Sequence, residues 1–98
     1  AQVHVSETFI EHVMAVVQAT RDHPELDLGA SPRAGIALLK ASRARALIHG
    51  RDYVVPEDLY ALGEDVLLHR IRASYEALAE GRDAGVILEE ILGESTKG

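Results

Sequence analysis

The sequence predicts a mainly α-helical domain, built as a small bundle of four helices. Apolar residues recur at intervals of three and four in successive stretches, as they do on the buried face of a helix. Serine, proline or aspartate stands where helices would begin, and glycine stands where two of them would end. The length of 98 residues fits one domain, and 47% of the residues are hydrophobic with one Phe and no Trp, so the core must be aliphatic.

The first helix is expected over about residues 6–22. Ser6 can cap its start, and apolar residues follow at helical spacing: Ile10, Val13, Met14 and Val17. Pro24 ends the helix, because the residue before a proline is driven out of the helical region. The loop that follows is expected to pack against the domain at two points, Leu26 and Leu28.

The second helix is expected over about residues 32–49. Ser31 is a strong N-cap residue, whose side-chain oxygen can accept a hydrogen bond from an N–H group of the first turn. Pro32 suits the first helical position. Arg33 adds positive charge to a helix end that is already partly positive, which destabilises it by about 0.3–1 kcal/mol. A guanidinium beside exposed N–H groups is a favourable site for phosphate; a solvated surface arginine is the other interpretation.

Apolar residues cover nearly the whole circumference of this second helix. They form one stripe rich in alanine (Ala34, Ala37, Ala41, Ala44, Ile48) and one bulkier stripe (Ile36, Leu39, Ala46, Leu47). A helix that is apolar nearly all round is expected to lie centrally, with neighbours on more than one side. Arg43 falls inside the bulkier stripe, so it must extend to solvent or pair with a carboxylate.

The third helix is expected over about residues 56–70. Pro56 suits its first position, and the acidic residues after it complement the positive end of the helix. Gly63 in the middle destabilises the helix by about 1 kcal/mol relative to alanine, and a close contact with the alanine-rich stripe would explain it.

A fourth, short helix is expected over about residues 84–92. Residues 71–82 precede it and are expected to be extended, because the polarity of the first of them alternates. We expect one short β pairing between residues 53–55 and residues 71–75.

Charge is distributed unevenly along the chain. The net charge is −6, yet residues 28–51 hold five basic residues and no acidic one. This basic centre could meet an anion, or the acidic residues of the chain itself could neutralise it. The sequence has no phosphate loop, no zinc-binding helix motif and no cysteine, so we expect neither a metal site nor an enzyme that is complete within these residues.

No apolar run has the length of a membrane span, and no signal peptide is visible. Together with the lack of cysteine this fits a reducing compartment, and we expect a cytoplasmic location. Since the sequence begins without Met, we expect it to be a piece of a longer protein.

Four sequence blocks follow one another closely. They are Ala19 to Pro24 (ATRDHP), Leu28 to Ala34 (LGASPRA), Gly50 to Asp58 (GRDYVVPED) and Val66 to Arg70 (VLLHR). In composition, order and spacing they resemble the C-terminal lid domain of MoxR-type AAA+ ATPases. The lid of this family is a small helical bundle after the nucleotide-binding core. The resemblance implies that the core, with its phosphate loop, Mg²⁺ site and catalytic acid, would lie upstream.

The resemblance also implies roles for individual residues. In the family, the arginine of the Gly-Ala-Ser-Pro-Arg block is the sensor 2 residue, which reaches the γ-phosphate of ATP bound to the core. Carried over, Arg33 would act in catalysis as sensor 2, and Ser31, Pro32 and Arg33 would form the lid's part of the nucleotide site. Structural roles, including contacts between lid and core, would fall to Thr20, Arg21, Arg51 and Asp58.

The activity and partners of the whole protein follow from the same resemblance. The full-length protein would be an ATP hydrolase that uses ATP and Mg²⁺, whereas the fragment alone would bind neither. Its partners would be the upstream core, the neighbouring subunits of a ring oligomer, and proteins with von Willebrand factor A domains. Closure of the lid over ATP would couple hydrolysis to chaperone-like remodelling or maturation of those proteins.

Two other functions remain open at the level of sequence. One is a DNA-binding module that uses the second helix, where Arg33, Lys40 and Arg43 fall within an arc of roughly 80°. The net charge of −6 argues against it, because nucleic-acid modules are usually basic, and we do not expect nucleic acid as a partner. The other is a protein-interaction bundle without a nucleotide role.

Overall fold

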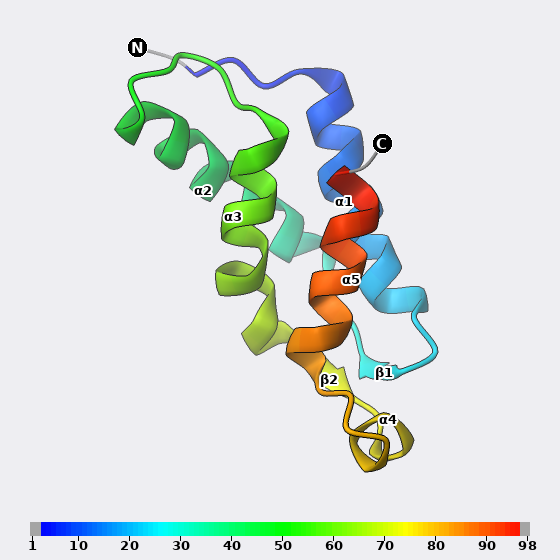
Figure 1. Cartoon of the computed structure of the whole chain (residues 1–98). Helices are drawn as coiled ribbons and strands as arrows, with labels where there is room; N and C mark the ends of the chain where they lie inside the picture. Colours follow the sequence, from blue (N-terminus) through cyan, green and yellow to red (C-terminus); the bar gives the residue numbers. More distant parts are fainter. Residues whose placement is uncertain (1–2, 97–98) are drawn as a thin grey trace.

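The computed structural model describes residues 3–96, and the side chains of residues 3–93. Along the chain lie α1 (Glu7–Asp22), β1 (Leu26–Leu28), α2 (Pro32–Ile48), α3 (Pro56–Leu67), the 3-10 helix η1 (Leu68–Arg70), β2 (Arg72–Ala73), α4 (Tyr75–Ala79) and α5 (Ala84–Thr96) (Figure 1). The mainly α-helical fold class is therefore confirmed. The four expected helices overlap α1, α2, α3 and α5, and α4 is an addition.

Local signals explain where the helices begin and end. The hydroxyl of Ser6 accepts a hydrogen bond from the backbone N–H of Phe9 at 3.1 Å, which caps α1. Pro32 and Pro56 occupy the first turns of α2 and α3. After α2 the chain turns at Gly50, whose φ of 73° is a left-handed conformation that favours glycine.

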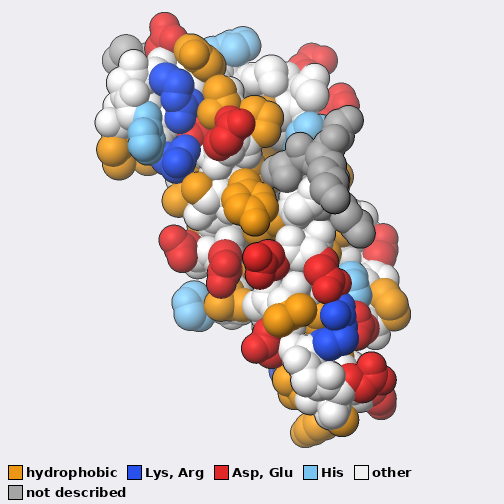
Figure 2. Space-filling model, viewed as in Figure 1, with side chains coloured by type: hydrophobic (Ala, Val, Ile, Leu, Met, Phe, Trp, Pro, Cys, Tyr) orange, Lys and Arg blue, Asp and Glu red, His pale blue; other side chains and the backbone are white. Residues whose placement is uncertain are grey.

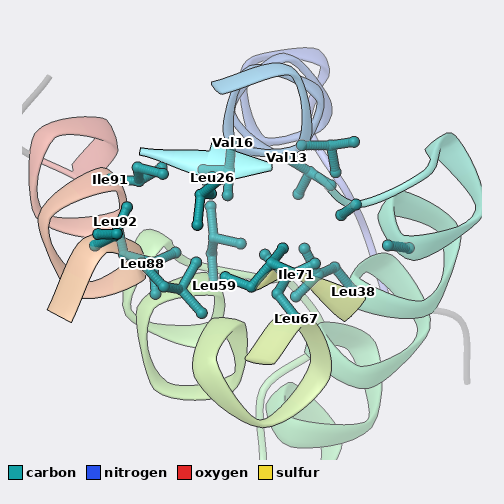
Figure 3. Close-up of a cluster of buried hydrophobic side chains, with 14 of the residues drawn as sticks. Val13, Val16, Leu26, Leu38, Leu59, Leu67, Ile71, Leu88, Ile91 and Leu92 are labelled. Carbon is teal, nitrogen blue, oxygen red and sulfur yellow. The ribbon is translucent and has the colours of Figure 1, made fainter. Parts of the chain in front are cut away.

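The four longer helices each pack against two others around one aliphatic core. Helix α1 contacts α2 and α5, and α3 likewise contacts α2 and α5 (Figure 1). Figure 3 shows the buried side chains between them, which include Val13, Val16, Leu38, Leu59, Leu67 and Leu88. Helix α2 therefore has a neighbouring helix on each of two sides. Its contact with α1 connects its N-terminus to the core.

The two strands form a small antiparallel sheet that differs from the expected pairing. Strand β2 pairs with β1, with Leu26 opposite Ala73, and the 53–55 segment instead contributes Tyr53 to a bridge with His4. The expected pairing of residues 53–55 with 71–75 is therefore wrong. The observed partner buries Leu26 and Ala73 together, whereas Leu28 is 48% exposed, so the loop packs against the core at one leucine only.

Residues 71–82 are not extended throughout, as the alternation suggested. Helix α4 occupies five of them, and the Ser74 hydroxyl caps it by accepting a hydrogen bond from the N–H of Ala77 at 3.1 Å. Ala77 is buried, whereas Tyr75 is 87% exposed. The expected extended structure is absent here because a short capped helix forms instead and buries Ala77.

The buried face of helix α2 follows neither predicted stripe and takes one fully buried residue from each, Ala34 and Ala46. Its buried residues are Ala34, Gly35, Leu38, Ser42 and Ala46. Of the bulkier stripe, Ile36 and Leu47 are exposed, whereas Ala46 is buried and Leu39 packs against the core. Arg43 is exposed as well. Among the described elements α2 packs chiefly along α1 and α3, and this leaves Ile36, Leu47 and Ile48 exposed.

Gly63 serves a contact other than the expected one. A Cβ at this position would lie 2.7 Å from Cδ2 of Leu92, on α5. The glycine therefore allows α3 and α5 to approach closely, and the alanine-rich stripe of α2 is not its partner.

Candidate functional site

The N-terminus of α2 is built from the three residues that the sequence singled out for the nucleotide site. Ser31 is the N-cap in extended conformation, and its carbonyl oxygen accepts the N–H of Ala34 at 2.9 Å. Pro32 and Arg33 follow in the first turn, and all three residues are exposed. The Ser31 hydroxyl makes no capping hydrogen bond, so the expectation that its side chain satisfies the first turn is wrong.

The loop before α2 is fixed to the last turn of α1. The Thr20 hydroxyl accepts a hydrogen bond from the N–H of Ala30 at 3.0 Å and donates one to the carbonyl of Val17 at 2.6 Å. Thr20 and Ala30 are both fully buried. A Cβ on Gly29 would lie 2.5 Å from Cα of Arg21, so the loop backbone touches the α1 backbone directly. The predicted residues Thr20 and Arg21 therefore lie beside the predicted nucleotide residues.

Arg33 has no ion pair and no side-chain hydrogen bond within the described residues 3–96. Arg21, at the end of α1, is likewise exposed and has none there. By contrast, Arg82 binds Glu25 at 2.8 Å and Glu90 at 2.7 Å. Figure 2 shows basic side chains gathered over the C-terminal part of α2 and near the start of α5, with acidic side chains beside them at both places. Among the described residues Arg33 is thus an unpaired cation, whereas Arg45, Arg51, Arg72 and Arg82 are each paired with a carboxylate.

Arg51 and Asp58 form a second centre, at the far end of α2 from Arg33. The Asp58 side chain is fully buried. Its carboxylate accepts hydrogen bonds from Arg51 at 2.7 and 3.0 Å, from Arg45 at 2.6 Å and from the N–H of Val55 at 2.8 Å. Twelve residues of helix separate Arg33 from Arg45, about 18 Å at 1.5 Å per residue. The predicted set therefore divides between two places.

The charge of Asp58 is held by its partners. Burial raises the pKa of a carboxyl group, but the hydrogen bonds from Arg51, from the Val55 backbone and from Arg45 outweigh it and lower the pKa of Asp58 to about 2. The carboxylate also caps the start of α3, since it satisfies the N–H of the N-cap residue Val55. This centre joins α2, the following turn and α3.

Sequence reasoning missed Arg45 in this centre. It expected Arg43 to extend to solvent or to pair with a carboxylate, and Arg43 does extend to solvent. The arginine that makes the ion pair is Arg45. The usable signal was the helical phase of Leu38, Ser42 and Arg45, which share the buried side of α2.

Arg33 lines neither of two surface depressions of the domain. Two surface depressions are lined by other residues: Arg45, Pro56, Glu57, Tyr60 and Ala61 in one, and Asp27, Arg72, Ala73, Tyr75 and Leu78 in the other. Within the described part of the chain, no three His, Cys, Asp or Glu side chains are grouped so as to hold a metal ion. None of the described helices is long and apolar enough to cross a membrane.

Comparison with known proteins defines the class of this domain. Residues 18–91 match the family described as the AAA lid domain, which is about three quarters of the chain. A crystal structure of a protein from Cytophaga hutchinsonii, described provisionally as an ATPase, superposes with a TM-score of 0.85 at 37% identity. The match covers 94% of this chain and 31% of that one. The chain therefore belongs to the AAA lid domain family.

Curated relatives specify the type of lid. The chain is 44% identical over 90 residues to the uncharacterized protein YeaC of Bacillus subtilis, and 36% identical over 97 residues to chaperone MoxR1 of Mycobacterium tuberculosis. The matches cover 92% and 90% of this chain but 28% and 26% of those proteins, so the chain spans about a quarter of their length. The resemblance to the lid of MoxR-type AAA+ ATPases is confirmed.

Proposed function

We propose that this domain closes over ATP bound to an upstream ATPase core, and that Arg33 is the sensor 2 residue that contacts the γ-phosphate. The observation that carries the proposal is the state of Arg33. It is exposed at the start of α2, beside a hydroxyl that caps nothing, and it has no partner within residues 3–96. A free guanidinium at a helix N-terminus is suited to a phosphate group supplied from outside.

The chemistry of Arg33 follows from its charge and shape. A guanidinium can donate two parallel hydrogen bonds to phosphate oxygens and keeps its charge throughout the physiological pH range. ATP bound with Mg²⁺ would supply the phosphoryl group, and Arg33 would stabilise the charge on it. Ser31 and Pro32 would set the position of the helix start against the phosphates.

The same contact would report the state of the nucleotide. ATP would hold the lid closed through Arg33, and loss of the γ-phosphate would release it. In a ring oligomer this movement would pass to the upstream core and to neighbouring subunits. One relative is named a chaperone, and we infer a chaperone-like activity on partner proteins, including proteins with von Willebrand factor A domains.

Arg33→Ala in the full-length protein tests the proposal. We expect turnover of ATP to fall by about a hundredfold, since one donor to the transition-state charge is lost, while the melting temperature is unchanged because Arg33 is exposed and unpaired in the described residues. Arg72→Ala is the matched control, because it removes an arginine that is 67% exposed and that pairs with Asp27 on the surface. Unchanged turnover in the Arg33 variant would refute the sensor 2 role.

One observation favours a second candidate, an interaction of the exposed face of α2 with another macromolecule. Lys40 and Arg43 are exposed and have no partner within the described residues. Ile36 and Leu47 are also exposed, at 56% and 52%. Such a mixture suits a protein surface better than the backbone of DNA, and salt-sensitive gel shifts at micromolar concentration would reverse that preference.

A further inference from the structure

We propose that Thr20 is the positioning residue for Arg33. Its buried hydroxyl fixes the loop before α2 to the last turn of α1, and this sets where the guanidinium begins its reach. The inference rests on the function proposed above and adds a residue that acts through Arg33 without touching nucleotide.

The Thr20 hydroxyl acts both as a hydrogen-bond donor and as a hydrogen-bond acceptor. It donates its proton to the carbonyl of Val17 at 2.6 Å, and its oxygen accepts the N–H of Ala30 at 3.0 Å. Donation to α1 orients the hydroxyl, so its lone pairs point toward the loop. The bond to Ala30 crosses ten positions of sequence and joins the loop before α2 to the last turn of α1.

The adjoining backbone leaves the loop little room to move. Ala30 is fully buried. At Gly29 a Cβ would lie 2.5 Å from Cα of Arg21 and 2.6 Å from the carbonyl oxygen of Thr20. Two consecutive loop residues are therefore held against the same turn of α1, one by a hydrogen bond and one by direct packing.

Between this contact and Arg33 the chain is stiff. Ser31 is an extended N-cap, Pro32 has its φ fixed by its ring, and the Ser31 carbonyl binds the N–H of Ala34 at 2.9 Å. The contact made by Thr20 therefore sets the position of the Arg33 Cα, while the side chain of Arg33 stays exposed to solvent. Positioning of this kind matters in catalysis, because a displacement of about 1 Å can reduce a rate by about a hundredfold.

A double-mutant cycle in the full-length protein separates positioning from mere stabilisation. Thr20→Val keeps the branched shape and removes the hydroxyl, and Thr20→Ser keeps the hydroxyl. We expect Thr20→Val to lower kcat for ATP about tenfold, as a small displacement of Arg33 would, and Thr20→Ser to retain most of the rate. In a chain that already carries Arg33→Ala, Thr20→Val should lower kcat no further.

The controls make each outcome decisive. Ile87→Val trims another fully buried side chain, far from the loop in sequence, and should change kcat by the same small factor with or without Arg33. An equal loss from Thr20→Val in both backgrounds, or no loss in either, would overturn the positioning role. If Thr20→Val fails to fold, Gly29→Ala replaces it in the cycle. This variant perturbs the same contact between the loop and α1 and retains the Thr20 hydroxyl. Failure of the proposed function is seen separately, as normal turnover in Arg33→Ala alone.

Discussion

The arginines of this domain serve two purposes, and the partners of each side chain determine which purpose it serves. Arg45 and Arg51 both bind the buried carboxylate of Asp58, where they neutralise a charge that could not otherwise be buried. Arg33 has no such partner in the described residues. Since a guanidinium does not lose its charge, an unpaired one stays in water or takes an anion from another molecule.

Asp58→Asn tests the role of the two arginines that bind Asp58. The change keeps the size of the side chain but leaves two arginines without a counter-charge. Because the pKa of Asp58 falls from 3.8 to about 2 on folding, its charge adds about 2 kcal/mol to the free energy of unfolding. A carboxyl group whose pKa is lowered on folding stabilises the folded state at pH values above its ordinary pKa. That stability is lost as the pH falls from about 4 to 2.

Urea unfolding at several pH values measures this contribution. The variant should be less stable than the original chain by about 2 kcal/mol at pH 7, and the difference should shrink toward zero near pH 2. Asp27→Asn is the control, since Asp27 is 40% exposed in its pair with Arg72 and such pairs contribute at most about 1 kcal/mol. A deficit in Asp58→Asn that is the same at pH 2 and pH 7 would contradict the ion-pair account.

At the scale of elements, the connection between α1 and α2 is the part on which the site depends. It contains β1, one buried leucine and a loop that touches the α1 backbone. Here the contact is between main chains, so side-chain movement cannot relieve a clash. At Gly63 the opposing atoms belong to the flexible side chain of Leu92, which can move.

Gly29→Ala is therefore expected to be the more damaging glycine substitution. Its Cβ would meet backbone atoms at 2.5 to 2.8 Å, so the loop must shift, which reduces the free energy of unfolding by about 1–3 kcal/mol. Thermal unfolding measures it. In the matched control Gly93→Ala, the new Cβ would meet no atom of the described residues within 4 Å, and helix propensity favours alanine by about 1 kcal/mol. Equal melting temperatures of the two variants would show that the loop does not touch α1 as described.

At the scale of the whole molecule, the features that sequence could predict are those set by near neighbours. Ser6, Pro32 and Pro56 each act within one turn of a helix, so the starts of the first three helices lie where they were expected. Arg33 was also predictable as an exposed cation at a helix start. Ser74 offered the same kind of signal for α4, and the alternation of its neighbours hid it.

The remaining features depend on contacts that local rules do not determine. The partner of β2 is decided by which short segment can bury Leu26 with Ala73, a contact across 47 positions of sequence. The buried side of α2 depends on how many helices cover it. Thr20 and Ala30 meet only after the chain has turned back, so the hydrogen bond that holds the site was not visible in the sequence.

The whole domain is expected to provide only half of a nucleotide site. At the start of α2 the described residues offer ATP the guanidinium of Arg33 and one helix N-terminus, and Arg33 lines neither of the two surface depressions described above. A hydrogen bond to a charged group contributes about 1.5–3 kcal/mol, whereas a dissociation constant of 1 mM already requires about 4 kcal/mol. Calorimetric titration of the 98-residue chain with ATP should therefore give a dissociation constant weaker than about 1 mM. Micromolar binding that is lost in Arg33→Ala would mean that the lid holds nucleotide by itself, and the upstream core would then not be needed to complete the site.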